Sequence, residues 1–155
     1  MIPPVNHISA QSEVTIMKKL IITAMAMALT VSGCAAVNET VDKAAKENGA
    51  VTTSSGMVYK SIRPGFGKSP NINSIVEVNY RGTFPDGIEF DSNKKSRFSL
   101  ARVIPCWREG LQMMKVGGKA QLVCPPELAY GKNGIGTDIP PDATIIFEVE
   151  LLNIE

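Results

Sequence analysis

Histidine and cysteine, which commonly carry nucleophilic and metal chemistry, are few in this 155-residue chain. The only histidine, His7, lies in an N-terminal stretch that we expect to be absent from the mature protein, so Ser/His/Asp and Cys/His mechanisms lack their base. The three cysteines, Cys34, Cys106 and Cys124, show no Cys-x-x-Cys spacing, and zinc would also lack its usual imidazole ligands. The sequence therefore predicts no metal site and no cofactor.

Cys34 ends a segment that has the layout of a secretory signal. Lys18 and Lys19 precede an apolar run, residues 20–31, and small residues follow it. The run is too short to cross a hydrocarbon core, which takes roughly 20 residues. Residues 31–34 (VSGC) resemble a bacterial lipobox, in which the cysteine is acylated and becomes the new N-terminus. The alternative is an ordinary signal peptide with a coincidental cysteine.

These features divide the chain into four segments. We expect residues 1–16 to be an over-extended start, residues 17–33 a lipoprotein signal peptide, residues 34–55 a lipidated tether, and residues 56–155 the folded domain. Aspartate does not follow the cysteine, which by resemblance to bacterial sorting rules favours the outer membrane. The expected location is the cell envelope, with the domain lipid-anchored and facing the periplasm.

Overall charge gives no reason to expect a nucleic-acid partner. Removal of residues 1–33 leaves 14 basic and 14 acidic side chains. A protein that binds nucleic acid through phosphate contacts normally carries an excess of basic residues.

Three segments alternate apolar and polar residues, which is typical of half-buried β-strands. They are residues 75–80, 119–124 and 144–154. One short helix is predicted after Pro105, where Trp107, Leu111 and Met114 recur at helical spacing until a glycine pair ends it. The pattern predicts an α+β fold with one helix across a curved antiparallel sheet. Spacing alone favours core packing for the tryptophan.

Four motifs occur in order along residues 56–155, and together they resemble the FKBP-type peptidyl-prolyl isomerases. The motifs are VNYRGTFPDGIEFDS (78–92), VIPCWREGLQMMKVGGKA (103–120), PPELAYG (125–131) and IPPDATIIFEVELLNI (139–154). The resemblance implies a half-wrapped antiparallel β-sheet around one short α-helix.

The resemblance also implies a proline pocket. The residues that match its catalytic positions are Tyr80, Asp91 and Tyr130. The residues that match its substrate-binding positions are Phe90, Val103, Ile104, Trp107, Ile139 and Phe147. Trp107 would form the floor, although each aromatic residue could instead belong only to the core.

Such a pocket would act by stabilising a twisted amide. Breaking amide resonance costs roughly 18–20 kcal/mol, and the twisted form is less charge-separated, so an apolar pocket favours it. By analogy with the family, the Tyr130 hydroxyl and the Ile104 N–H would each bond a substrate carbonyl. Asp91 would order Tyr80 or interact with the rotating carbonyl; its alternative role is to cap a turn.

The chain departs from the family pattern at three places. Residues 91–98 are shorter than in many relatives, and Ser96 stands where some members have an aromatic residue, which puts affinity for macrolide inhibitors in doubt. The loop after Tyr130 is irregular across the family, so peptide preference cannot be inferred. Cys106 replaces a common glycine and could form a disulfide with Cys124; the alternative is two buried free thiols.

The predicted function is therefore peptidyl-prolyl cis-trans isomerase activity on proline-containing unfolded or nascent secreted polypeptides. The alternative is a non-catalytic chaperone or peptide-binding module of the same fold. Residues 34–55 are shorter than the N-terminal dimerisation modules of some family members, so a monomer is expected.

Overall fold

The computed structural model describes residues 34–155 as one compact unit, with side chains described from Glu39 onward. The expected over-extended start (1–16), the expected signal peptide (17–33) and His7 lie outside the described residues. Among the residues that are described, no helix has the length and apolar character needed to span a membrane.

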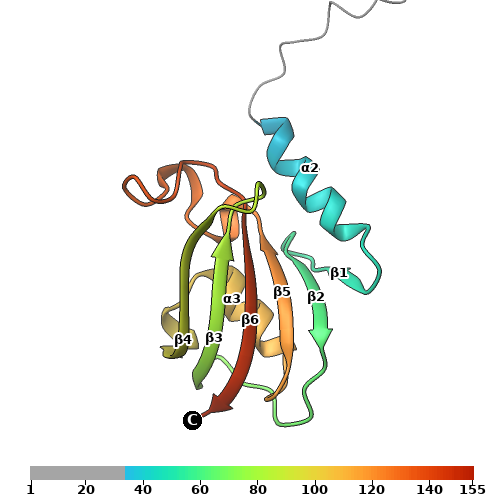
Figure 1. Ribbon diagram of the computed structural model, residues 1–155, viewed down its shortest axis with the longest axis vertical. Coiled ribbons are helices and arrows are strands. Elements are labelled where there is room, and N and C mark those ends of the chain that lie inside the picture. Colours follow the sequence, from blue (N-terminus) through green and yellow to red (C-terminus); the bar gives the residue numbers. More distant parts are fainter. Residues whose placement is uncertain (1–33) are drawn as a thin grey trace, which may run out of the picture. The chain divides into compact units, whose positions relative to one another are not determined.

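Six antiparallel strands form a single sheet in the order β1-β2-β5-β6-β3-β4 (Figure 1). The strands are β1 (Ala50–Thr52), β2 (Val58–Arg63), β3 (Ile75–Thr83), β4 (Glu89–Ser99), β5 (Lys119–Cys124) and β6 (Ile145–Ile154). The three strands predicted from alternation are confirmed as β3, β5 and β6. Strands β1 and β4 form the two edges, because each pairs with a neighbour on one side only.

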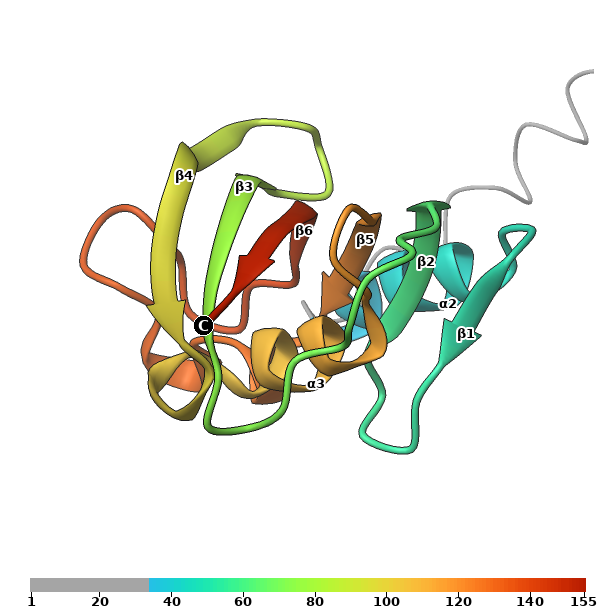
Figure 2. The same cartoon turned by 90° about the horizontal axis from the view of Figure 1, so that it is seen from below.

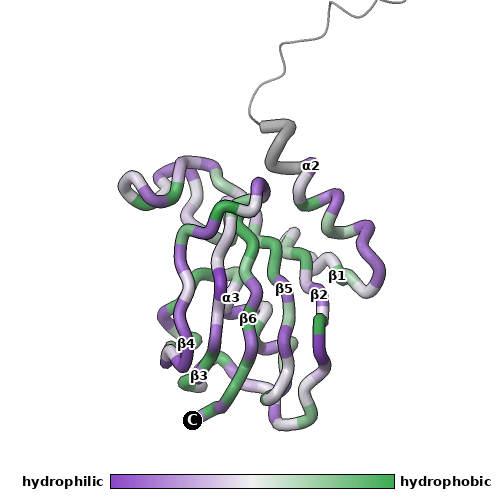
Figure 3. Tube along the Cα trace, viewed as in Figure 1, coloured by the Kyte–Doolittle hydropathy of each residue, from purple (hydrophilic) through white to green (hydrophobic). Residues whose placement is uncertain are grey.

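Alternation along β6 shows how the sequence determines which face of the sheet is buried. Ile145, Phe147, Val149 and Leu151 are buried, whereas the residues between them are partly exposed. Successive side chains of a strand point to opposite faces, so this pattern turns one face toward the core. Hydropathy alternates along the central strands in the same way (Figure 3).

Helix α3 (Pro105–Met113) lies across the concave side of the sheet (Figure 2). Proline is the first helical residue, and a tight Lys115–Gly118 turn follows the helix, as the sequence predicts. Gly110 allows a close approach to β5, because a Cβ there would lie 2.6 Å from the Leu122 side chain. The predicted α+β fold, an antiparallel sheet curved around one short helix, is confirmed.

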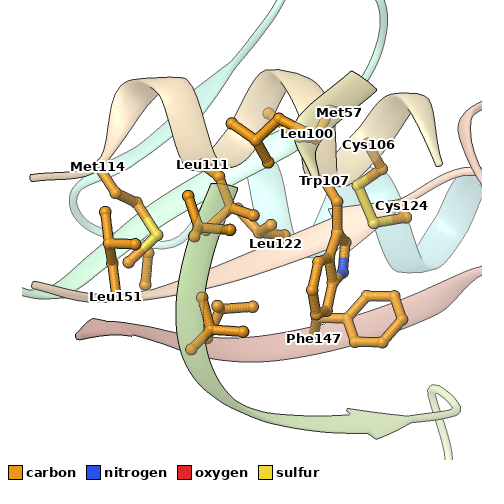
Figure 4. Close-up of a cluster of buried hydrophobic side chains, with 14 of the residues drawn as sticks. Met57, Leu100, Cys106, Trp107, Leu111, Met114, Leu122, Cys124, Phe147 and Leu151 are labelled. Carbon is orange, nitrogen blue, oxygen red and sulfur yellow. A yellow bond between two sulfur atoms is a disulfide. The ribbon is translucent and has the colours of Figure 1, made fainter. Parts of the chain in front are cut away.

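The main core lies between α3 and the sheet (Figure 4). Its fully buried members include Met57, Leu111 and Leu122. Cys106, in the first turn of α3, and Cys124, the last residue of β5, are joined by a disulfide with a Cα–Cα distance of 5.7 Å. The bridge therefore fixes the first turn of the helix to the end of the strand.

Residues 34–55, which we expect to be a lipidated tether, contain regular structure. Helix α2 (Cys34–Ala45) precedes β1, and β1 pairs with β2. Ala44 packs with Val58 and Val123, whose side chains form a second cluster apart from the main core. Short isolated helices are marginal in water, so the contact with the sheet accounts for α2 better than its own propensity does.

Three short 3-10 helices complete the fold: η1 (Leu100–Arg102), η2 (Pro126–Leu128) and η3 (Gly131–Asn133). The first leads from β4 into α3, and the other two lie in the connection between β5 and β6. These connections bring the chain back to one end of α3, where the candidate site lies.

Candidate functional site

A cavity of about 310 Å³ opens beside the first turn of α3. Strands β3, β4 and β6, helix η1 and the segment after η2 all contribute to its walls. The lining residues are Tyr80, Phe90, Asp91, Phe98, Arg102, Val103, Ile104, Trp107, Tyr130 and Phe147.

Trp107 lies at the centre of the aromatic side chains around this cavity. Its ring centroid is 5.2 Å from that of Tyr80, 5.2 Å from that of Phe147 and 5.3 Å from that of Phe98, all in edge-to-face geometry. Only 5 % of the side chain is exposed, and its Nε1 is buried without a hydrogen-bond partner among the described residues. The indole therefore contributes a rigid apolar surface.

Gly82 of β3 makes room for two further rings. A Cβ at this position would lie 2.6 Å from the Phe90 ring and 2.8 Å from the Phe147 ring. The centroids of these two rings are 5.7 Å apart, again edge to face. A side chain at residue 82 would therefore force one or both rings to move.

Tyr80 and Asp91 form the polar part of the strand wall. The Tyr80 hydroxyl donates a hydrogen bond of 2.8 Å to Asp91 Oδ2, across the β3–β4 pair. Burial, the bond to Asp91 and the charge of Asp91 raise the pKa of Tyr80 from 10.0 to about 12. At neutral pH Tyr80 is therefore an uncharged donor and Asp91 its acceptor.

Tyr130 immediately precedes η3, in the connection between β5 and β6. Burial, followed by the charge of Asp91, raises the pKa of Tyr130 above its ordinary value. No other described residue bonds its hydroxyl. A neutral hydroxyl without a protein partner can donate to a carbonyl that enters the cavity.

Arg108 fixes the backbone at the opposite wall. Its guanidinium donates to the carbonyl oxygens of Leu100, Ala101 and Val103 at 3.3–3.4 Å. The next residue, Ile104, is the N-cap of α3, and the first N–H groups of a helix lack intrahelical acceptors. The Ile104 N–H is thus held at the edge of the cavity with its donor capacity available.

The structure brings together most of the residues that the sequence singled out. Tyr80, Asp91 and Tyr130 line one cavity with five of the six expected substrate-binding residues. Ile139 does not line it: the residue is 4 % exposed and its backbone bonds that of Ile135, so it holds the loop before β6 in place.

Two lining residues, Phe98 and Arg102, were not predicted. Phe98 ends a polar stretch of β4, where the only signal was an isolated aromatic residue. No feature of the sequence indicated Arg102. Among the side chains that the structure describes, from Glu39 onward, no group of three or more histidine, cysteine or acidic residues is placed to hold a metal ion.

The shifted tyrosine pKa values predict how stability depends on pH. Tyr80 keeps its proton in the folded chain up to about pH 12 but loses it near pH 10 when unfolded. The unfolded state therefore binds fewer protons over this interval, and the free energy of unfolding should fall from pH 10 toward pH 12.

Denaturant titrations across this interval measure the effect. Tyr80→Phe should make the decline shallower, although Tyr59 and Tyr130, whose pKa values are also raised by burial, will retain part of it. Tyrosinate absorbance provides the check. Equal titration curves for the native and the unfolded chain would contradict the shifts.

Comparison of the chain with known proteins identifies similar families and relatives. The model of the FKBP-type peptidyl-prolyl cis-trans isomerase family matches residues 67–152. Over 118 residues the chain is 48% identical to the FKBP-type peptidyl-prolyl cis-trans isomerase FkpA of Escherichia coli K12, covering 74% of this chain and 43% of FkpA. The FKBP-type 22 kDa peptidyl-prolyl cis-trans isomerase of the same organism is 42% identical, with 74% and 57% covered.

Solved structures agree with this similarity. The crystal structure of FkpA from Escherichia coli superposes with a TM-score of 0.77 at 39% identity, covering 97% of this chain and 75% of that one. A peptidyl-prolyl cis-trans isomerase from Pseudomonas syringae gives 0.76 at 32% identity, covering 83% and 99%. The chain spans less than half the length of the curated FkpA sequence that it matches.

Proposed function

Since this chain belongs to the FKBP-type peptidyl-prolyl cis-trans isomerase family, we propose that its aromatic cavity binds proline and accelerates the rotation of X-Pro peptide bonds. The observation that carries the proposal is the grouping of Trp107, Tyr80 and Phe147 around one open cavity beside two polar donors. Uncatalysed rotation takes roughly tens to hundreds of seconds, so an enzyme can accelerate it substantially.

The apolar rings act on the amide itself. In the ground state the peptide bond is planar and charge-separated, and water stabilises it. Twisting about C–N removes this resonance, so the transition state loses less when it leaves water for an aromatic cavity. The reaction makes and breaks no covalent bond, which agrees with a site that offers rings and donors.

The polar groups hold the substrate on either side of the rotating bond. The Tyr130 hydroxyl donates to one substrate carbonyl and the Ile104 N–H to another, which fixes the backbone in a turn-like pose. Asp91 accepts from Tyr80 and so keeps that ring and hydroxyl oriented. In this assignment Tyr80, Asp91 and Tyr130 are the catalytic groups, and Phe90, Val103, Ile104, Trp107 and Phe147 bind the proline.

Removal of either polar group should slow catalysis without unfolding the domain. Tyr130→Phe deletes one hydrogen bond to substrate, and Asp91→Ala releases the Tyr80 hydroxyl; each should lower kcat/KM about two- to tenfold. Isomerisation of a Leu-Pro peptide, followed with the full chain, measures both. The matched control is Tyr59→Phe, which removes a hydroxyl from β2, away from the cavity.

Wild-type kcat/KM in both Asp91→Ala and Tyr130→Phe would overturn the assignment of these roles. An inactive wild-type chain that still binds the peptide would favour the non-catalytic chaperone instead. The two failures differ, because the first leaves the isomerase intact and the second removes it.

We further propose that the chain is a lipoprotein of the cell envelope, anchored by Cys34 after removal of residues 17–33. The support is the VSGC sequence at residues 31–34 that follows a basic and apolar leader. Cys34→Ser should move the protein from the membrane fraction to the soluble fraction of cells that express it. Mass spectrometry of the mature wild-type N-terminus checks acylation directly, and an unmodified Cys34 would contradict the anchor.

The proposed location in the cell envelope indicates which polypeptides would be substrates. An envelope isomerase would act on proline-containing unfolded or nascent secreted polypeptides, and macrolide inhibitors would compete for the same cavity.

We propose that the chain is a monomer. The buried Ala44 of α2 packs against strands of its own chain, and α2 is short, so little of this helix is available to pair with a second copy. Light scattering of the purified chain tests the monomer.

A further inference from the structure

Arg102 differs from the other arginines in that its side chain has no ion-pair or hydrogen-bond partner among the described residues. Arg63, Arg81 and Arg97 pair with glutamates, and Arg108 bonds three backbone carbonyls. Arg102 is exposed and makes no ion pair or side-chain hydrogen bond with any residue from 34 to 155. Its guanidinium is therefore free to bind an anionic group.

Arg102 is one of the residues that line the cavity proposed to bind proline. Arg102 ends η1, immediately before Val103 and Ile104, and it is the only cationic residue among those that line the cavity in the described chain. Arg108 bonds the carbonyl oxygens of Ala101 and Val103, so the backbone on both sides of Arg102 is fixed. The backbone that carries the exposed Arg102 side chain is thus held in place.

The cavity's one negative charge lies on another wall and is already engaged. Asp91, on β4, accepts the hydroxyl of Tyr80 and forms no ion pair with Arg102. The cavity therefore has an anionic side on β4 and a cationic side on η1. A peptide held across it would meet a different charge on each side of its proline.

We propose that Arg102 determines specificity, by favouring substrates that carry an acidic residue next to, or one residue removed from, the proline. The inference rests on the proposed isomerase function and adds a substrate class to it. Arg is well suited to the role, because its planar guanidinium can donate two parallel hydrogen bonds to one carboxylate. As an exposed pair, the contact should raise kcat/KM about two- to fivefold.

The test uses pairs of short proline peptides that differ only by Glu or Gln, placed in turn at the two positions on each side of the proline. For each variant of the full chain, the Glu/Gln ratio of kcat/KM is measured at low salt. The wild-type ratio should exceed one at one or more of these positions. It should approach one in Arg102→Gln, fall below one in Arg102→Glu, and decrease with added salt.

Lys115→Gln is the matched control, because it removes one positive charge from an exposed residue away from the cavity. It should keep the wild-type ratio. Equal ratios in the wild type and Arg102→Gln at all positions would overturn the proposal. If no peptide is isomerised, the proposed function fails, and the same ratio is then taken from dissociation constants measured by the fluorescence of Trp107, the only tryptophan.

Discussion

Trp107→Ala should abolish measurable isomerase activity and lower the free energy of unfolding by about 3–5 kcal/mol. The change removes an indole that lines the cavity, together with its edge-to-face contacts to Tyr80, Phe98 and Phe147. The side chain is only 5 % exposed, so its loss leaves a void in the main core. Denaturant unfolding followed by circular dichroism measures the stability, and the peptide assay measures the activity.

Leu111→Ala is a control that separates the loss of activity expected for Trp107→Ala from its loss of stability. Leu111 is fully buried one turn further along α3 but does not line the cavity. Its truncation should cost about 2–5 kcal/mol of stability and leave kcat/KM unchanged under conditions where the variant is folded. Activity in folded Trp107→Ala equal to that of folded Leu111→Ala would contradict the role of the tryptophan as the floor.

Reduction of the Cys106–Cys124 disulfide should lower the free energy of unfolding by about 3 kcal/mol. The bridge joins residues 18 apart in sequence, and its main effect in the loop-closure account is to restrict the unfolded chain. Denaturant curves with and without reductant, recorded for the Cys34→Ser chain, measure the difference. The Cys34→Ser background leaves these two thiols as the only ones.

The double variant Cys106→Ala/Cys124→Ala provides the control, because reductant should not change its stability. Thiol titration of the unfolded, unreduced Cys34→Ser chain decides whether the bridge exists in the isolated protein. No free thiol is the expected result. Two free thiols would mean that the cysteines pack as small apolar residues, and the stability difference on reduction should then disappear.

Residues with a strong local pattern were predictable from the sequence. Along β6, alternation identified the buried face, and Pro105 with the helical spacing of Trp107 and Leu111 identified the start and the buried side of α3. The helix ends at Met113, a few residues before the glycine pair that was expected to end it. The polar residues of the cavity walls could not be predicted from a local sequence pattern. Tyr80 and Asp91 come from two strands, and only the resemblance to a family suggested that they meet.

Elements that depend on tertiary contacts were not predictable. Strand β4 contains the polar run NKKSR and lies at an edge of the sheet. An edge strand pairs with a neighbour on one side only and is exposed to solvent on the other, so its sequence need not alternate as that of a buried strand does. A bulge near Lys95, whose backbone N–H bonds Asn79 Oδ1, further interrupts its pattern. Helix α2 likewise depends on Val58 and Val123, which are distant in sequence.

Ile139 was expected from its motif to bind substrate, but it is not among the residues that line the cavity. Its backbone bonds that of Ile135 in the loop before β6. Arg102 illustrates the converse, since no motif marks it and only the path of η1 brings it to the cavity. The roles of residues in such loops therefore have to be determined from the structure rather than from sequence motifs.

Exchange between the cis and trans forms of a Leu-Pro peptide at equilibrium, measured by nuclear magnetic resonance with a small amount of the full chain, tests the central claim most directly. An isomerase lowers the barrier without changing the two populations, so the exchange rate should rise in proportion to protein concentration while the cis fraction stays constant. Substitution of Trp107 by alanine should remove the increase. Exchange at the uncatalysed rate in the presence of folded wild-type protein would contradict the account.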